Sequence, residues 1–229
     1  MKNLDISNII DDYLEEGRDY SKKQFEEHMK EESSIDNLLE VYHYLENSKS
    51  KRATILKGIM ENTIGGKYIE KYKIIPREAM ALRFLELIVG KEVSKIDYHA
   101  HDDYWHFDFI MEEGHINGIF INEVYIEKIN FLEFFPYLKN LRITIAGLKQ
   151  IKGLHKLRYL KCLDLRANCI TALPDLKDLV NLEVLSVGAN PISSIKGIEQ
   201  LKKLRSLDLD DTNLPKKYIK QQYDSLYGA

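Results

Sequence analysis

Hydrophobic residues in the second half of the chain recur at a fixed step of 22 residues. One unit contains Leu163, Leu165, Asn168, Ile170, Leu173, Leu176, Leu179 and Leu182. The next contains Leu185, Val187, Asn190, Ile192, Ile195, Ile198, Leu201 and Leu204. Two steps back the columns stay apolar, but Ala146 and Val124 replace the asparagine, and a fifth unit opens at Leu207. Such a period predicts a solenoid of stacked coils.

Within each unit, two leucine-type residues flank one variable residue. This alternation predicts a short strand with both apolar side chains inward, stacked in parallel on the strands of neighbouring coils. We expect Asn168 and Asn190 to turn inward and hydrogen-bond the loop backbone of adjacent coils. Ala146 and Val124 cannot do so, and Thr212 can do so only in part.

The unit LxxLxLxxNxI resembles the leucine-rich repeat, and the match covers residues 116–214. Its 22-residue period resembles the short subclass found in internalins and in a regulatory subunit of protein phosphatase 1. The resemblance implies a parallel sheet on the concave side of the solenoid, with returns through 3₁₀ or short helical turns. It implies protein binding as the function.

The segment before the repeats is similar to the leading segment of leucine-rich repeat proteins abundant in Asgard archaea. That likeness names no activity. It rests on Pro76-Arg77-Glu78-Ala79, Leu82, Leu85, Leu87, Gly90-Lys91, Trp105-His106-Phe107-Asp108-Phe109 and Gly114-His115-Ile116-Asn117-Gly118-Ile119.

Helical periodicity dominates residues 5–89. One apolar face recurs at helical spacing and comprises Ile35, Leu38, Leu39, Tyr42 and Leu45. A further segment, 50–62, is expected to stop before Gly65-Gly66. Pro76 in a first turn and Gly90 beyond the end bracket an almost wholly apolar helix over 76–89.

A β-hairpin is expected after these helices, over 104–111 and 115–121 with its turn at Glu113-Gly114. The whole reading is an α+β chain: a helical cap region over 1–95, then a hairpin and five-repeat solenoid over 96–229. A short amphipathic helix within 215–229 is expected to cover the last coil.

Composition places the chain among globular proteins. It has 229 residues, of which 44% are apolar, and no stretch reaches the roughly 18 apolar residues of a membrane span. The start is acidic, without a basic and apolar leader, and two cysteines make no disulfide framework or zinc site, so we expect a cytoplasmic protein. We also expect a monomer.

Charge is distributed unevenly along the chain. Residues 1–46 hold 5 Lys/Arg against 13 Asp/Glu, and residues 47–95 hold 11 against 5. The basic stretch 49–73 could touch RNA or anionic lipid, but the acidic segment beside it neutralises its charge, which favours a solvated helical face. We therefore expect helices that pair within one domain and not a nucleic-acid site.

Catalytic motifs are weak. His99-Ala100-His101-Asp102-Asp103 resembles the start of the HxHxDH signature of metallo-β-lactamase-like hydrolases, but Tyr104 stands at its last ligand position. A metal-dependent hydrolase at His99 and His101 is thus the least favoured alternative. Gly65-Gly66-Lys67 lacks the first glycine and the Ser or Thr of a phosphate loop. We expect no enzyme, no cofactor and no bound metal.

The exposed strand positions form columns that can be read directly. They predict a binding face with a mixed aromatic end, a small-residue centre and an acidic far end, suited to a protein partner with a basic segment. The favoured function is a non-catalytic protein-binding module or adaptor, and the alternative is a regulatory subunit or effector of a phosphatase or small GTPase. The candidate binding residues are Phe120, Arg142, Asp164, Arg166, Val184, Ser186, Asp208, Asp210 and Asp211.

Overall fold

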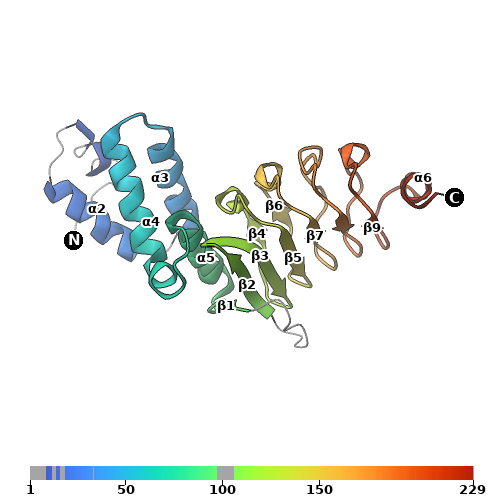
Figure 1. The fold of residues 1–229 in the computed structure, drawn as a ribbon, viewed down its shortest axis with the longest axis horizontal. Helices are drawn as coiled ribbons and strands as arrows, with labels where there is room; N and C mark the ends of the chain where they lie inside the picture. The colour runs from blue at the N-terminus through green and yellow to red at the C-terminus, as the bar shows by residue number, and fades with distance from the viewer. Residues whose placement is uncertain (1–8, 12–13, 16–18, 33, 97–105, 229) are drawn as a thin grey trace. The chain divides into compact units, whose positions relative to one another are not determined.

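The chain divides into two compact units, residues 1–87 and 88–229 (Figure 1). The structure, a computed structural model, describes residues 9–11, 14–15, 19–32, 34–96 and 106–228. Helices make up the first unit, and a β-hairpin, a solenoid and a last helix make up the second.

The first unit contains helices α2 (Asp19–Glu31), α3 (Ile35–Asn47), α4 (Lys51–Tyr72) and α5 (Pro76–Val89). Ser34 and Ser50 cap α3 and α4, each accepting a backbone N–H within the first turn. Leu38, Leu39, Tyr42 and Leu45 are buried, which confirms the predicted face of α3. The predicted bounds of α5 are also confirmed.

The prediction that Gly65-Gly66 ends a helix is wrong, because α4 continues through both glycines to Tyr72. It ends at Lys73, whose φ of 59° is left-handed. Gly65 serves close packing: a Cβ there would lie 2.7 Å from the backbone nitrogen of Met80 in α5. At Gly66 a Cβ would meet no atom within 4 Å. A glycine in a helix can thus mark a close backbone approach and not a stop.

A buried carboxylate ties α4 to α5. The Glu86 side chain is 1% exposed and accepts hydrogen bonds from Lys67 Nζ at 3.2 Å, Arg83 Nη1 at 2.8 Å and the Tyr68 hydroxyl. Two cations and a hydroxyl offset the cost of burying this charge.

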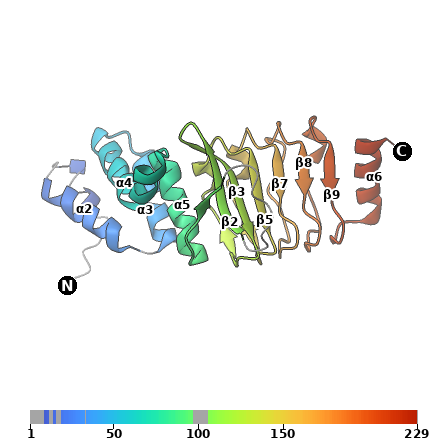
Figure 2. The ribbon, with the colours of Figure 1, turned by 60° about the horizontal axis from the view of Figure 1, so that its bottom comes forward.

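The larger of the two sheets of the second unit has its described strands in the order β1-β2-β3-β5-β7-β8-β9, and Figure 2 shows this order from β2 to β9. The hairpin β2 (His106–Glu112) and β3 (His115–Asn122) turns at Glu113-Gly114, both at positive φ, as predicted. The short strand β1 (Ser94–Lys95) pairs parallel to β2. The remaining strands run parallel to β3: β5 (Asn140–Thr144), β7 (Cys162–Asp164), β8 (Val184–Ser186) and β9 (Ser206–Asp208).

The register confirms the 22-residue step, since each strand residue pairs with the residue 22 positions later. Leu141 pairs with Leu163, and Leu163 with Leu185. The return side has 3₁₀ helices, as expected: η1 (Leu132–Phe134), η2 (Leu154–Lys156) and η3 (Ile198–Gln200). It also has two short parallel strands that were not predicted, β4 (Lys128–Ile129) and β6 (Gln150–Ile151).

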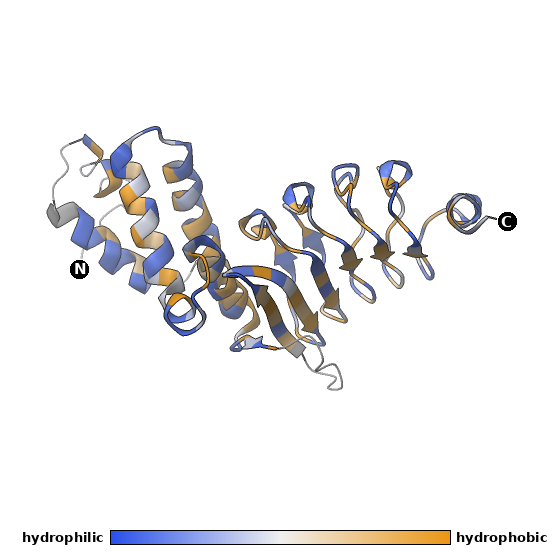
Figure 3. Cartoon of the chain, in the orientation of Figure 1, coloured by the Kyte–Doolittle hydropathy of each residue, from blue (hydrophilic) through white to orange (hydrophobic). Residues whose placement is uncertain are grey.

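The repeated leucines form the core of the solenoid, and hydrophobic and hydrophilic residues share each coil (Figure 3). Asn168 is buried there: its Oδ1 accepts from the N–H groups of Ala146 and Leu148 at 3.0 Å, and its Nδ2 donates to Ile143 and Leu165 oxygens. The predicted bridging role is therefore confirmed.

Asn190 repeats the arrangement one coil later, between Ile170 N–H and the oxygens of Leu165 and Val187. Where the asparagine is missing, backbone replaces it: Ile126 N–H donates to Ala146 oxygen at 2.9 Å. Among the described residues, Thr212 donates only to the Leu209 oxygen of its own coil, so its side chain makes no bridge to the adjacent coil.

Each coil turns through one left-handed residue just before the asparagine column. All have φ between 51° and 56° although none is glycine: Glu123, Ile145, Ala167, Ala189 and Asp211. Ile145 is the costliest of them, because a β-branched side chain crowds the backbone in this conformation.

Helix α6 (Lys216–Tyr227) closes the far end of the solenoid. Leu209 N–H donates to the Tyr223 hydroxyl at 3.0 Å, and Leu207 N–H donates to the Tyr227 hydroxyl at 2.9 Å. In the preceding coil the N–H of Val187 donates instead to Asp208 oxygen on the next strand. The two tyrosines thus take the place of a sixth strand along the exposed edge.

Candidate functional site

The sheet face, the outward side of strands β3 to β9, is one surface in regular register. Its middle column pairs Phe120, Arg142, Asp164, Ser186 and Asp208 in sequence across the strands. The column before it runs from Gly118 through Val184 to Ser206. The residues of each predicted column therefore lie side by side on neighbouring strands, whose backbones are about 4.8 Å apart.

A chain of alternating charges crosses this face, formed by Arg142, Asp164, Arg166 and Asp208. Arg142 Nε lies 3.3 Å from Asp164 Oδ2. Arg166 grips the same carboxylate with both Nε at 3.0 Å and Nη2 at 2.9 Å, in the two-pronged geometry that orients a guanidinium. Its Nε also lies 4.0 Å from Asp208 Oδ2. Its bonds to Asp164 raise the pKa of Arg166.

Asp164 has a different place from the one expected of a binding residue. Its side chain is 4% exposed, beneath arginines that are 45% and 51% exposed. The two neighbouring arginines cover it, and the alignment of repeat positions in the sequence does not show this burial. Asp164 therefore holds Arg142 and Arg166 in position, while they present the surface.

The predicted small-residue trough is spanned by charged side chains. A Cβ at Gly188 would lie 2.7 Å from Asp208 Oδ1, so the carboxylate rests on that glycine. Ser186 and Val184 are half-buried beside it. The small residues leave the space in which Arg166 and Asp208 approach one another across β8.

The acidic end is partly engaged within the chain. Asp208 Oδ1 accepts from Asp210 N–H at 3.1 Å, and Asp210 Oδ1 accepts from the Tyr223 hydroxyl of α6 at 3.0 Å. Asp210 remains exposed. Asp211, also exposed, occupies the left-handed turn and stands apart from the charge chain.

The opposite end of the sheet face combines apolar and polar side chains. The Phe120 ring lies over Gly118, where a Cβ would be 2.8 Å from ring atom Cε2. Beyond it a cavity of about 410 Å³ is lined by Ile96, Ile110, Met111, Glu112, Asn117, Lys139 and Asn140. Lys139 Nζ donates to Glu112 at 2.8 Å at its rim, and this bond lowers the pKa of Glu112.

The columns chosen from the sequence missed an aromatic ladder. His115, Tyr137 and Tyr159 follow the same 22-residue step, with ring centroids 4.0 Å and 5.6 Å apart. Tyr137 is 43% exposed and Tyr159 is 53% exposed. Stepping the repeat through the residues before each strand would have revealed it.

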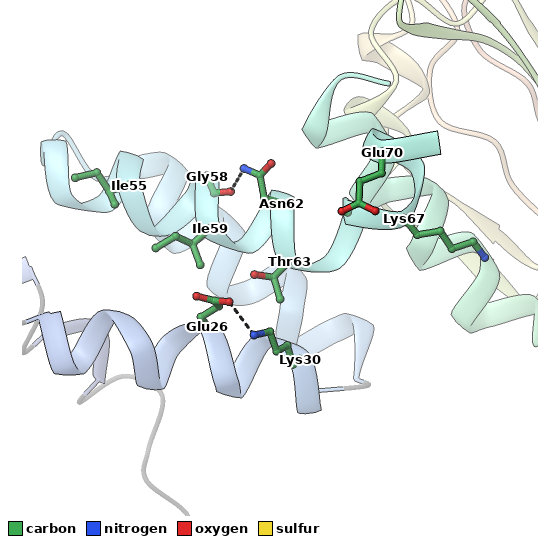
Figure 4. A pocket seen from close by; sticks show the side chains of 10 residues that line it. Glu26, Lys30, Ile55, Gly58, Ile59, Asn62, Thr63, Lys67 and Glu70 are labelled. Atoms are coloured by element: carbon green, nitrogen blue, oxygen red, sulfur yellow. Dashed lines mark hydrogen bonds and ion pairs between the residues drawn. The ribbon is translucent and has the colours of Figure 1, made fainter. Parts of the chain in front are cut away.

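The helical unit has an open pocket of about 590 Å³ between α2 and α4 (Figure 4). Polar groups along it bond within their own helices: Lys30 to Glu26 at 2.8 Å and Asn62 to the oxygen of Gly58 at 2.6 Å. Lys67 points away from the other labelled side chains (Figure 4), and its Nζ donates to Glu86 Oε1 at 3.2 Å. These contacts leave the pocket without a convergent set of chemical groups.

The histidine motif at His99 and His101, with Asp102 and Asp103, lies outside the described residues. Within the described ranges, no cluster of three or more His, Cys, Asp and Glu side chains could hold a metal ion. Both cysteines are free thiols, Cys162 half-buried and Cys169 exposed. Burial, and then the charge of Asp164, raise the pKa of the Cys162 thiol and disfavour the reactive thiolate.

Among the described helices, none combines the length and the apolar character that a membrane crossing requires.

Comparison with known proteins identifies the repeats. Residues 160–199 match the family model described as leucine rich repeats, in two copies. The chain therefore contains leucine-rich repeats, and their register extends from β3 to β9. Comparison with curated protein sequences finds no match.

Among solved structures, an internalin from Listeria monocytogenes matches with 18% sequence identity and a TM-score of 0.42. The match covers 57% of this chain and 45% of the internalin, so the matched part is less than half of that protein.

Proposed function

We propose that this leucine-rich repeat protein is a non-catalytic protein-binding module, an adaptor, whose docking surface is the sheet face. Stacked coils build an extended surface that suits a macromolecule better than a small substrate. The observation that carries the proposal is the charge chain, because Asp164 binds Arg166 through two hydrogen bonds and forms an ion pair with Arg142 before any partner arrives. Such preorganisation lowers the entropy cost of binding.

A cytoplasmic location belongs to the same proposal. The exposed thiol of Cys169 and the half-buried thiol of Cys162 are compatible with a reducing compartment.

The test is affinity capture with the full chain from a lysate of the source organism. Arg142→Glu combined with Asp208→Lys reverses both ends of the charge chain at constant net charge. The matched control, Lys152→Glu combined with Glu199→Lys, makes the same exchange at exposed positions of the return side.

The proposal requires a protein that the natural chain and the control capture and that the sheet-face variant loses. Binding must then be reproduced with the two purified proteins. Capture that is equal for both variants, or lost only in the control, would place the site elsewhere.

A further inference from the structure

We infer that the sheet face recognises an extended peptide segment of its partner that carries one acidic and one basic side chain about four residues apart. The inference rests on the proposed function and specifies the partner. It follows from which donors and acceptors of Arg142, Asp164, Arg166 and Asp208 are paired with one another and which face solvent.

The basic end retains unused donors. Arg142 meets Asp164 through Nε, and in the part of the chain that the structure describes its two Nη groups make no hydrogen bond. The side chain is 45% exposed, so this half of the fork faces solvent. A carboxylate is the group that fits a guanidinium fork held in one orientation.

The acidic end retains unused acceptors. The side chain of Asp208 is 33% exposed, and among the described residues the cation near its Oδ2 is Arg166, whose Nε lies 4.0 Å away. Asp210 beside it is exposed and has one oxygen engaged by Tyr223. A Lys or Arg side chain is the complement of this pair of carboxylates.

The spacing between the ends follows from the strands. Arg142 lies on β5 and Asp208 on β9, with β7 and β8 between them. The strands that carry the two ends are three spacings of about 4.8 Å apart, so their backbones are separated by about 14 Å, which an extended peptide covers in about four residues at 3.3 Å each. Between the ends the Asp208 carboxylate rests on Gly188 and the half-exposed Arg166 side chain approaches it, so a crossing peptide would lie over these side chains.

Synthetic peptides test this directly. Each is a Gly/Ser chain with blocked ends that holds one Glu and one Lys, separated by none to six residues and in both orders. Affinity for the full chain is measured by fluorescence anisotropy at low salt. We expect the tightest binding at about three intervening residues, roughly tenfold tighter than for adjacent charges.

Charge exchange makes the test specific. Asp208→Lys should weaken binding of the Glu/Lys peptide about tenfold, and should favour the peptide in which Glu replaces that Lys. Arg142→Glu should do the converse with a Lys/Lys peptide. Lys152→Glu on the return side should leave all affinities unchanged.

Affinity that does not depend on spacing, a variant that shows no exchange of preference, or no binding by any peptide would overturn the inference. The proposed function fails separately. If a captured partner depends on the sheet face but its bound segment lacks this charge spacing, the adaptor stands and the peptide rule is wrong. If no capture depends on the sheet face, the function itself is wrong.

Discussion

The helical unit and the solenoid satisfy their backbone groups in different ways, and this decides how each is specified. A helix bonds its own backbone, so the first unit is fixed by contacts that occur once, such as Gly65 against α5 or Glu86 among its donors. A coil of the solenoid depends on its neighbours, so the same contacts return every 22 residues. We therefore expect the loss of a contact that occurs once to reduce the stability of the protein more than the loss of one contact in a repeated set.

The largest effect is expected where two helix backbones are in close contact at a single position. Gly65→Ala places a Cβ 2.7 Å from Met80 N, which forces two backbones apart and should cost about 3 kcal/mol of unfolding free energy. Gly66→Ala is the matched control, because its Cβ meets nothing and should stabilise α4 by up to about 1 kcal/mol. Urea unfolding followed by circular dichroism measures both. Similar shifts for the two variants would mean that the helices do not approach at Gly65.

A repeated contact should cost less. Asn190→Ala removes the partner of the Ile170 N–H and of the buried Val187 oxygen and should cost about 1 to 3 kcal/mol. Asn140→Ala, on the half-exposed sheet face, should cost about 0.5 kcal/mol or less. The same unfolding measurement applies. Equal losses would contradict the assigned register of the asparagine column.

The end of the solenoid has fewer shared contacts than its middle. Tyr223→Phe and Tyr227→Phe each remove one acceptor from the last strand, and each should cost about 1 kcal/mol. Tyr159→Phe is the control, because its hydroxyl has no hydrogen bond to any residue that the structure describes. Hydrogen exchange of Leu207 and Leu209 amides should accelerate only in the first two variants. Unchanged protection would show that α6 does not close this edge.

The smallest effect is expected at a position where the repeat carries strain. Ile145→Gly relieves a β-branched residue at φ 51° and should stabilise the protein by about 0.5 to 1 kcal/mol, after the entropy cost of glycine. Ala189→Gly, at φ 52°, should change stability less, because alanine crowds the turn less. Melting temperatures compare the two variants. A destabilised Ile145→Gly would show that its side chain contributes more than its backbone costs.

The sequence allowed the solenoid to be predicted residue by residue, because every column is supported by several coils. Leu163, Asn168 and their equivalents 22 residues later occupy the predicted places. The length of α4 could not be predicted in this way. Gly65 has a meaning only against Met80, a contact that no periodicity announces.

The sheet face stands between these cases. Its columns follow from the repeat, so Arg142 and Asp208 lie where they were expected. The burial of Asp164 depends on how two arginines lean across their neighbours, which is a matter of side-chain conformation and not of spacing. The aromatic ladder of His115, Tyr137 and Tyr159 follows the same step, but it lies outside the columns that were compared, which begin at Gly118, Asn140 and Cys162.

The tyrosines of α6 also decide how long the solenoid is. Each coil presents the same hydrogen-bonding groups to the next coil, so the coils themselves do not limit how many can stack. Tyr223 and Tyr227 end the stack by accepting hydrogen bonds from the backbone N–H groups of Leu209 and Leu207 at its last edge. A coil duplicated ahead of β9 would find familiar neighbours on both sides and leave α6 the same two N–H groups to close. Length in this protein is thus a modular property, separable from the surface that each coil carries.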